Sequence, residues 1–319
     1  MLNNISLFSF ASDANVSRAL VEEFTQSHPI ECTTGVKART IGFEPPFIDA
    51  NLEAPWAEHF EQRSLVKVVV EQRKPSRQQI TRVYNERVRE LLKQGVSLTR
   101  KMERELKKAV AADLIKEVAP IQQSYFMVFD FETKLLWVSM QSKQDLDSLK
   151  GLLVDCNLRI KEEALNHNIE QIITDMLRDP SNAIKSDEFD LGHAVKLKEL
   201  DGEEHSQSVY SSQDLGNDEI ESNLEHGKCA TSLELVYKDA VRFRINNRQQ
   251  LTNIKLIANV DTLGLDLENQ ESKDDRLYAD LRFRAHLRVS IIQSLIAPVR
   301  SLLSDELCGG TPDFQVITN

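Results

Sequence analysis

The chain has 319 residues, with 39 Lys or Arg against 50 Asp or Glu, so its formal net charge at pH 7 is −11. Its apolar content of 41% is ordinary for a globular protein, and no window approaches the roughly 18 consecutive apolar residues of a membrane span, which argues against a membrane protein. The four cysteines are scattered without a C-x-x-C pair, which argues against a disulfide framework or a zinc site and fits a reducing cytoplasm.

The first elements of the chain are predicted to be a strand, a helix and a second strand. Residues 2–10 place apolar side chains in near alternation, which is typical of a strand. Ser12 or Asp13 is a candidate N-cap for a helix that runs to about residue 26. Segment 42–46, Gly-Phe-Glu-Pro-Pro, should break any regular element, because proline fixes φ and restricts its predecessor. Residues 65–70 (LVKVVV) predict the second strand.

The segment 73–118 carries most of the positive charge of an otherwise acidic chain. It holds 13 Lys or Arg and 6 Asp or Glu, so its net charge is +7 and the rest of the chain carries −18. A charge separation of this size predicts that a polyanion binds at one place and is repelled elsewhere.

This basic segment is predicted to form two helices that Gly95 separates and Pro120 ends. Apolar residues recur at helical spacing in the first helix at Ile80, Val83, Tyr84, Val88, Leu91 and Leu92, and in the second at Leu98, Met102, Leu106, Ala109 and Val110. Stepping about 100° per residue places an arc of about 120° of cations opposite the apolar face of the second helix. The arc consists of Arg100, Lys101, Arg104, Lys107 and Lys108. The second helix therefore has one face for a core and one for an anion.

The middle of the chain is predicted to contain a hairpin, a helix and an acidic segment. Residues 125–131 and 134–140 form the hairpin, and Ser142 caps a helix that ends near residue 155. Residues 187–225 include 12 acidic and 2 basic side chains, and positions 201–212 within them are expected to be loop or sheet edge. Residues 215–226 predict a short helix that Gly227 closes.

The last third is predicted to be a sheet followed by a helix. Residues 232–237, 241–245, 253–257 and 281–289 are candidate strands, and the last of them alternates apolar residues with Arg282, Arg284 and Arg288. Residues 290–303 are an amphipathic helix that Pro298 should bend or shorten, and residues 308–319 look like a loose tail.

Taken together, these elements predict an α+β fold of mixed sheets with a basic helical insertion. We divide it into an N-terminal α/β region (1–75 and 121–175), a basic helical region (76–120), an acidic connecting region (176–230) and a C-terminal sheet plus helix (231–319).

Three interpretations of the basic segment stay open. Its cations could bind phosphates, could be a solvated face paired with Glu86, Glu90, Glu103 and Glu105, or could hold an acidic protein partner. The stripes Arg242/Arg244 and Arg282/Arg284/Arg288 could extend a phosphate-binding surface. We favour an exposed sheet face with cross-strand ion pairs, or a dimer interface.

An enzymatic alternative rests on Asp261, Glu271 and Lys273, which match the D…E-x-K spacing of metal-dependent nucleases. The pattern is common by chance and lies in a polar, loop-like stretch. We therefore expect a protein that is not an enzyme, without cofactor or metal, with a metal-dependent DNA exonuclease as the alternative.

Several ordered features resemble the RdgC family and span most of the chain. They are the start at Met1-Leu2, Gly42-Phe43-x-Pro45-Pro46, the basic helices ending in Ala119-Pro120, the hairpin and helix at 125–155, Gln213-Asp214-Leu215, Glu219-Ile220, Glu225-x-Gly227-Lys228 and Thr231-x-Leu233-x-Leu235.

The resemblance implies a ring-shaped homodimer that encloses double-stranded DNA without sequence preference and restrains recombinase-driven strand exchange. It implies a cytoplasmic, nucleoid-associated protein that affects the recombinase indirectly, through DNA. The expected DNA contacts are Arg77, Arg82, Arg89, Lys93, Arg100, Lys101, Arg104, Lys107, Lys108 and Gln213. Two departures stand out: Ser212 occupies the place of a family lysine, and Ile121-Gln122 follow Pro120 where the family has an aromatic finger. The second departure puts a DNA-opening role in doubt and leaves phosphate binding intact.

Overall fold

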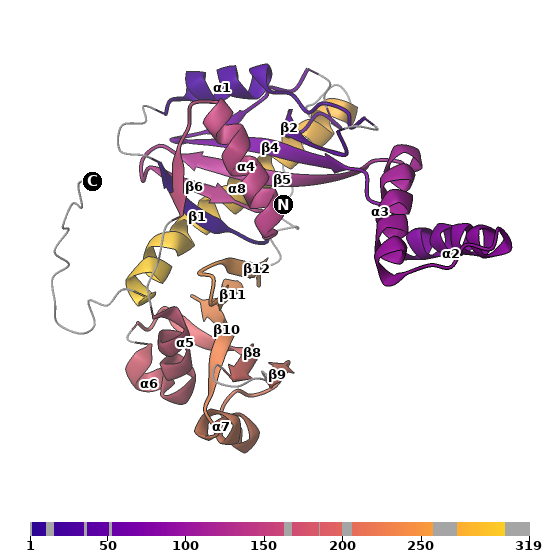
Figure 1. Ribbon diagram of the computed structural model, residues 1–319. Helices are drawn as coiled ribbons and strands as arrows, with labels where there is room; N and C mark the ends of the chain where they lie inside the picture. The colour runs from indigo at the N-terminus through magenta and orange to yellow at the C-terminus, as the bar shows by residue number, and fades with distance from the viewer. Residues whose placement is uncertain are drawn as a thin grey trace, which may run out of the picture.

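Two antiparallel β-sheets and eight helices form the described part of the chain, which confirms the predicted α+β class (Figure 1). The computed structural model describes residues 2–10, 16–34, 37–50, 53–162, 168–184, 186–199, 206–257 and 273–303. The strands are β1 (Ser6–Phe10), β2 (Arg39–Glu44), β3 (Glu58–Phe60), β4 (Arg63–Gln72), β5 (Ile121–Asp130), β6 (Leu135–Val138), β7 (Ile160–Glu162), β8 (Phe189–Glu199), β9 (Gln207–Ser211), β10 (Lys228–Tyr237), β11 (Val241–Asn246) and β12 (Leu251–Leu256). The helices are α1 (Arg18–Ser27), α2 (Arg77–Lys93), α3 (Arg100–Glu117), α4 (Lys143–Asp155), α5 (Ile169–Arg178), α6 (Pro180–Ala183), α7 (Asp218–Glu225) and α8 (Lys273–Leu303).

The larger sheet has seven strands in the order β2-β4-β5-β6-β1-β7, with β3 paired to β4 beside this path. Strand β4 lies between β5 on one side and β2 and β3 on the other. It is apolar from Leu65 to Val70 apart from Lys67, because both of its faces are covered. Leu65 packs into one hydrophobic cluster, whereas Val66 and Val68 pack into the other. The predicted hairpin is confirmed as β5 and β6.

Helices α1 and α4 cover one face of the larger sheet. Phe24 of α1 and Leu149 of α4 are buried there with Phe43 and Phe129 of the strands. Ser142 caps α4 by accepting a hydrogen bond from the Asp145 backbone N–H, as predicted. On the opposite face, Leu65, Val128 and Trp137 share a hydrophobic cluster with residues of α8 and of the second sheet, so both faces of the larger sheet are covered by apolar side chains.

The second sheet has five strands in the order β12-β11-β10-β8-β9. It joins the larger sheet at Ile5 and Leu251, which exchange backbone hydrogen bonds of 2.7 Å and 3.0 Å. Its strands β10, β11 and β12 confirm the strands predicted in the last third, with limits shifted by a few residues. Strand β9 pairs only with β8 among the described strands, which confirms the expected sheet edge over residues 207–211.

The strand predicted over residues 281–289 is wrong, because this segment lies inside the 31-residue helix α8. Ala285 and Val289 are shared by the alternating pattern and by a helical stripe that continues through Ile292, Leu295 and Val299. This stripe is buried against both sheets, and that tertiary burial decides in favour of the helix. The helix also runs through Pro298 and ends at Leu303.

Other departures from the predictions are local. Segment 42–46 does not exclude regular structure: Gly42 and Phe43 belong to β2, where Gly42 lets the backbone of Ile30 pass within 2.6 Å of the position that a Cβ would occupy. Ser17 caps α1, and the predicted caps Ser12 and Asp13 lie outside the described residues. Helix α7 begins at Asp218, after the Asn217 N-cap. Helix α5 and strand β8 were not predicted.

Candidate nucleic-acid interface

Residues 73–120, hereafter the arm, leave and rejoin the larger sheet at one point. Gln72 ends β4 and pairs directly with Ile121, which begins β5. Between them, α2 and α3 extend away from the sheet at a steep angle to each other (Figure 1). The two predicted basic helices are thus confirmed, and they form an insertion carried by the ends of two adjacent strands.

Local sequence signals set the ends of both helices. Ser76 and Gln79 form a capping box at the start of α2. At its end, Gly95 adopts φ +78° while its N–H donates to the Leu92 carbonyl and the Val96 N–H donates to the Leu91 carbonyl, both at 3.0 Å. This pair of bonds is the Schellman arrangement, in which a left-handed residue satisfies the last carbonyls of a helix. Thr99 then caps α3.

The contact between α2 and α3 is small. Arg87 Nη2 and Asp113 Oδ2 form an ion pair at 2.8 Å, and Val110 and Leu114 are buried on α3. No residue of α2 is buried. The apolar face predicted for α3 is therefore only partly correct, because Met102 is 38% exposed. Ala109 was also predicted to lie on this apolar face, which is wrong because Ala109 is exposed. Two helices alone enclose too little volume to bury a full face.

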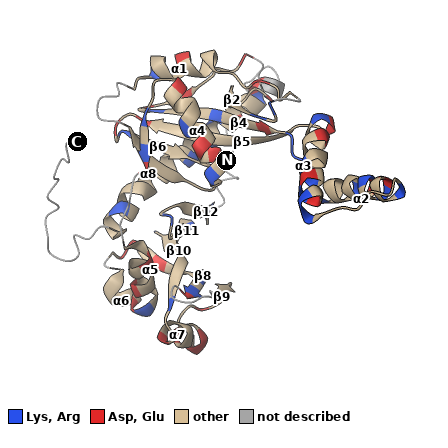
Figure 2. Ribbon diagram, in the orientation of Figure 1, with Lys and Arg blue, Asp and Glu red and all other residues tan. Residues whose placement is uncertain are grey.

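All nine cations predicted as DNA contacts on the arm are exposed. Figure 2 shows the basic positions spread over both helices. On α3, Asp113 faces α2 and lies at least about 120° around the helix from every member of the predicted arc. On α2, Arg87 is likewise at least about 120° away from Arg82, Arg89 and Lys93, whereas Arg77 lies only about 80° from it. The basic faces therefore point away from the contact between the helices.

The nine cations form no ion pair within 4.0 Å with any residue that the structure describes. Glu86, Glu90, Glu103 and Glu105, which a solvated face would use as partners, also form none with the described residues. The ion pair that the arm forms among the described residues, between Arg87 and Asp113, uses neither set. The cations of both basic faces are thus not held in ion pairs with the described residues.

A buried polar network holds the root of the arm against the larger sheet. The Glu71 carboxylate accepts hydrogen bonds from the Thr33 backbone N–H at 2.6 Å, the Thr33 hydroxyl at 2.7 Å and the Gln122 side-chain amide at 2.8 Å. These donors lower the pKa of Glu71, with the Thr33 backbone N–H the largest cause and the amide and hydroxyl next. The charged carboxylate therefore fixes the strand ends from which the arm projects.

Gln213, the tenth predicted contact, lies outside the arm, in the loop after β9. Its backbone N–H donates to the His193 carbonyl at 3.4 Å, and its side chain lines a cavity on the five-stranded sheet together with Arg242, Arg244 and Lys255. Lys255 was missed in the sequence, although it lies directly opposite Arg242 in the β11–β12 register. As DNA contacts, all ten residues stay predictions.

The two arginine stripes have different outcomes. Arg244 pairs across strands with Glu234 at 3.1 Å, which confirms the predicted sheet-face ion pair. The stripe on 281–289 belongs to α8 instead of a sheet. There Arg282 pairs with Glu58 at 2.9 Å, Arg284 with Asp280, and Arg288 donates to the Ile254 carbonyl at 2.9 Å. These three arginines are engaged within the chain.

The residues of the enzymatic alternative are only partly in view. Asp261 and Glu271 lie outside the described residues, and Lys273 begins α8. Across the described ranges, no group of three or more His, Cys, Asp or Glu side chains is placed to hold a metal ion. Ile121, which stands where the resemblance led us to expect an aromatic residue, is 54% exposed at the start of β5. A search of the described helices found none with the length and apolar character to cross a membrane.

Fold and interface together define an α+β protein whose larger sheet carries an outward-facing insertion of two basic helices. The chain belongs to the RdgC family, since its sequence matches the family described as "Putative exonuclease, RdgC" over residues 1–305. It is similar to the recombination-associated protein RdgC of Pseudoalteromonas translucida (strain TAC 125), with 24% identity over 270 residues that cover 82% of this chain and 84% of the relative. The resemblance seen in the sequence is confirmed.

Proposed function

We propose that this protein binds double-stranded DNA without sequence preference through the basic faces of its arm. The observation that supports it most directly is the set of nine exposed cations that have no ion-pair partner among the described residues. Lys and Arg side chains that neutralise phosphates release counterions, and such binding depends on charge rather than on base sequence. An arm anchored at its root would present this charge in a defined orientation.

The proposal extends to assembly and role. Two copies would form a ring-shaped homodimer around the duplex, and occupancy of the duplex would restrain recombinase-driven homologous recombination without direct contact to the recombinase. The name of the relative, a recombination-associated protein, supports the link to recombination. A protein that acts in this way would be cytoplasmic and associated with the nucleoid.

A salt titration of duplex binding tests the arm. We expect the triple variant Arg100→Glu, Arg104→Glu, Lys107→Glu to bind a labelled duplex far more weakly than the parent in fluorescence anisotropy. The plot of log affinity against log salt should also flatten by roughly 2–3 units between about 50 and 200 mM salt, since each lost phosphate contact removes about 0.9 from the slope.

The control variant changes the same total charge on the body of the protein. Lys143, Arg159 and Lys161 are exposed, and a triple substitution of them by Glu should leave both the affinity and the slope close to those of the parent. Equal losses in the two triple variants would refute the arm as the binding surface. Light scattering with and without duplex tests the homodimer, and a strand-exchange assay with a recombinase tests the restraining role.

A metal-dependent exonuclease is the second candidate function, because the matched family carries that activity in its description. Incubation of an end-labelled duplex with the protein and Mg²⁺ or Mn²⁺ tests it. If the parent degrades the duplex and neither Asp261→Ala nor Glu271→Ala does so, the result would favour the exonuclease function. Those carboxylates would hold the metal and activate water. Degradation that persists in both variants would come from a contaminant.

A further inference from the structure

A cavity of about 500 Å³ lies on the five-stranded sheet, on the side away from its apolar core. Strand β11 alternates buried Val241, Phe243 and Ile245 with Arg242 and Arg244, so both arginines emerge on the cavity side. Lys255 joins them from β12 and Gln213 from the loop after β9. Three cations from two adjacent strands thus line one hollow.

A buried carboxylate holds the two arginines in place. Glu234 is only 4% exposed, accepts a hydrogen bond from Arg244 Nε at 3.1 Å and lies 3.8 Å from Arg242 Nε. It also accepts from the His193 backbone N–H at 3.1 Å. Gly192 makes room for it, since a Cβ at that position would lie 2.6 Å from the Glu234 side chain. These contacts use the Nε atoms and leave the Nη groups without a hydrogen bond to any described residue.

Two buried donors in the cavity make no hydrogen bond with the described residues. They are Gln213 Nε2 and Arg242 Nε, which lies 3.8 Å from the Glu234 carboxylate. A buried N–H group without a partner is unfavourable unless a ligand or solvent accepts from it. Both unused donors belong to residues that line the same hollow, so a ligand that accepts several hydrogen bonds would satisfy them together with the free Nη groups.

The charge balance selects an anion. Arg242, Arg244 and Lys255 exceed the carboxylates of Glu234 and Asp214 by one positive charge in the lining. The planar fork of a guanidinium matches two oxygens of a phosphate, and an amide N–H adds a directional donor. We propose that this cavity is a phosphate subsite that takes one phosphodiester group of the DNA backbone. The inference rests on the proposed DNA binding and extends the expected Gln213 contact to Arg242, Arg244 and Lys255, which lie on two strands remote in sequence from the arm.

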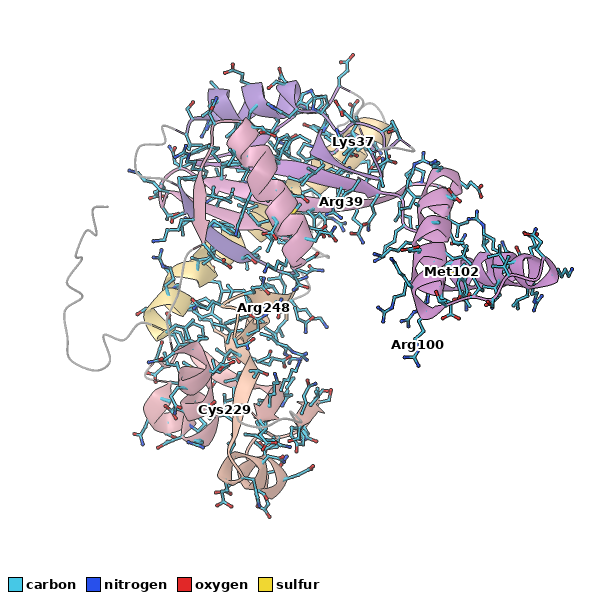
Figure 3. All side chains as sticks on the ribbon, viewed as in Figure 1. Lys37, Arg39, Arg100, Met102, Cys229 and Arg248 are labelled. Carbon is cyan, nitrogen blue, oxygen red and sulfur yellow. The ribbon has the colours of Figure 1, made fainter. Side chains whose placement is uncertain are left out.

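Two single substitutions of the full chain, with a matched control, test the subsite. Lys255 is exposed and makes no described ion pair, so Lys255→Gln removes charge without disturbing the fold. Arg244→Gln removes one guanidinium, and Arg248→Gln removes the same charge from the exposed β11–β12 turn outside the cavity (Figure 3). We expect Lys255→Gln and Arg244→Gln each to lower duplex affinity roughly eightfold at about 0.1 M salt, the value of one phosphate contact. Arg248→Gln should bind like the parent.

A titration with inorganic phosphate examines the cavity separately from DNA. In NMR spectra, the side-chain amide signal of Gln213 is assigned by its loss in Gln213→Leu. Added phosphate should change its chemical shift in the parent and in Arg248→Gln but not in Lys255→Gln. Duplex affinities of Lys255→Gln and Arg244→Gln equal to that of Arg248→Gln would overturn the subsite, even if the arm variants lose binding. If the parent binds no duplex, the proposed function fails, and a Gln213 signal that phosphate leaves unmoved would then remove the cavity as an anion site too.

Discussion

Arg73 Nη1 donates a hydrogen bond of 3.0 Å to the carbonyl of Val118, so the residue that leads into the arm holds the residue that leads out of it. The same guanidinium donates from Nε to the Thr33 hydroxyl at 3.0 Å, which links the arm to the segment beside β2. Because Thr33 also donates to the buried Glu71 carboxylate, the arm and the larger sheet share one polar network at the root. The direction of the arm is therefore fixed by side chains outside its two helices.

Arg73→Gln should loosen the root of the arm. The substitution removes the bond to Val118, so we expect faster hydrogen exchange at the amides of residues 118–122 and a duplex affinity several-fold lower than that of the parent. Lys74→Gln removes an equal charge from the exposed neighbouring residue. This control separates the effect of the lost charge on affinity from the effect of the arm's orientation. If both variants lose affinity equally and neither changes exchange, the network does not orient the arm.

Glu71 gives this root a dependence on pH. Its pKa is lowered in the folded chain by the N–H of Thr33, the Gln122 amide and the Thr33 hydroxyl. A carboxyl with a depressed folded pKa stabilises the protein fully above its unfolded pKa of about 4.3, and the contribution disappears as pH falls through the folded value. Glu71→Gln should therefore lower the free energy of unfolding by about 1–3 kcal/mol near neutral pH, with a smaller difference below about pH 4.

Urea denaturation of parent and Glu71→Gln between about pH 3 and 7 measures that difference. Glu31→Gln serves as the comparison, because Lys37 lowers the pKa of Glu31 in an exposed ion pair of 2.9 Å. Exposed pairs are screened by solvent, so this variant should change stability little at any pH. A difference for Glu71→Gln that does not vary with pH would show that the carboxylate is not the group that titrates.

The stability changes on substitution by alanine should have opposite signs at Gly95, which follows the end of α2, and at Gly151 inside α4. Gly95 has φ +78° and Gly151 lies inside α4, and nothing lies within 4 Å of the Cβ that either would gain. Gly95→Ala therefore tests backbone conformation alone and should destabilise the junction of the arm by about 1 kcal/mol. Gly151→Ala should stabilise the protein by about 0.5–1 kcal/mol, because alanine favours the helix. Hydrogen exchange in the arm measures the effect of Gly95→Ala, and urea denaturation measures the effect of Gly151→Ala. If both variants change stability in the same direction, the difference in backbone conformation does not explain the two effects.

Local signals explain why the arm could be predicted from the sequence. Gly95 specifies the break between the helices, and Ser142 likewise specifies the start of α4, through bonds that each residue makes with its near neighbours. Partners distant in the sequence could not be predicted in this way. Arg242 and Lys255 are brought opposite each other only by the β11–β12 register, and Gln213 reaches them only because β9 pairs with β8.

Helix α8 shows where a local pattern misleads. The alternation of apolar residues over 281–289 was consistent with a strand, but Ala285 and Val289 are also four residues apart, as a helical face requires. What decides between the two is the core of both sheets, which buries Ile292 and Leu295 beyond the alternating segment. Helix α5 carries a similar stripe, at Ile169, Ile173 and Leu177, so the signal for it was present in the sequence but not used.

The contact between α8 and β3 should make the free energy of unfolding fall at alkaline pH. The buried Glu58 carboxylate accepts hydrogen bonds from the Tyr278 hydroxyl and from Arg282 Nε, the latter at 2.9 Å. Burial, and then the bond to Glu58, raise the pKa of Tyr278 to about 12. Because the folded pKa exceeds the unfolded value of about 10, the stabilisation is complete below pH 10 and is lost as pH rises toward 12.

Tyr278→Phe removes only the hydroxyl, while Arg282 still compensates Glu58. We expect the free energy of unfolding to fall by about 1 kcal/mol near neutral pH and the difference from the parent to shrink above about pH 10, where the parent loses the same bond. Tyr84→Phe, on the arm and without a described hydrogen bond, controls for the loss of a tyrosine. Urea midpoints measured from about pH 7 to 11 decide the matter. A difference that persists unchanged at high pH would mean that the Tyr278 hydroxyl does not hold α8 against β3.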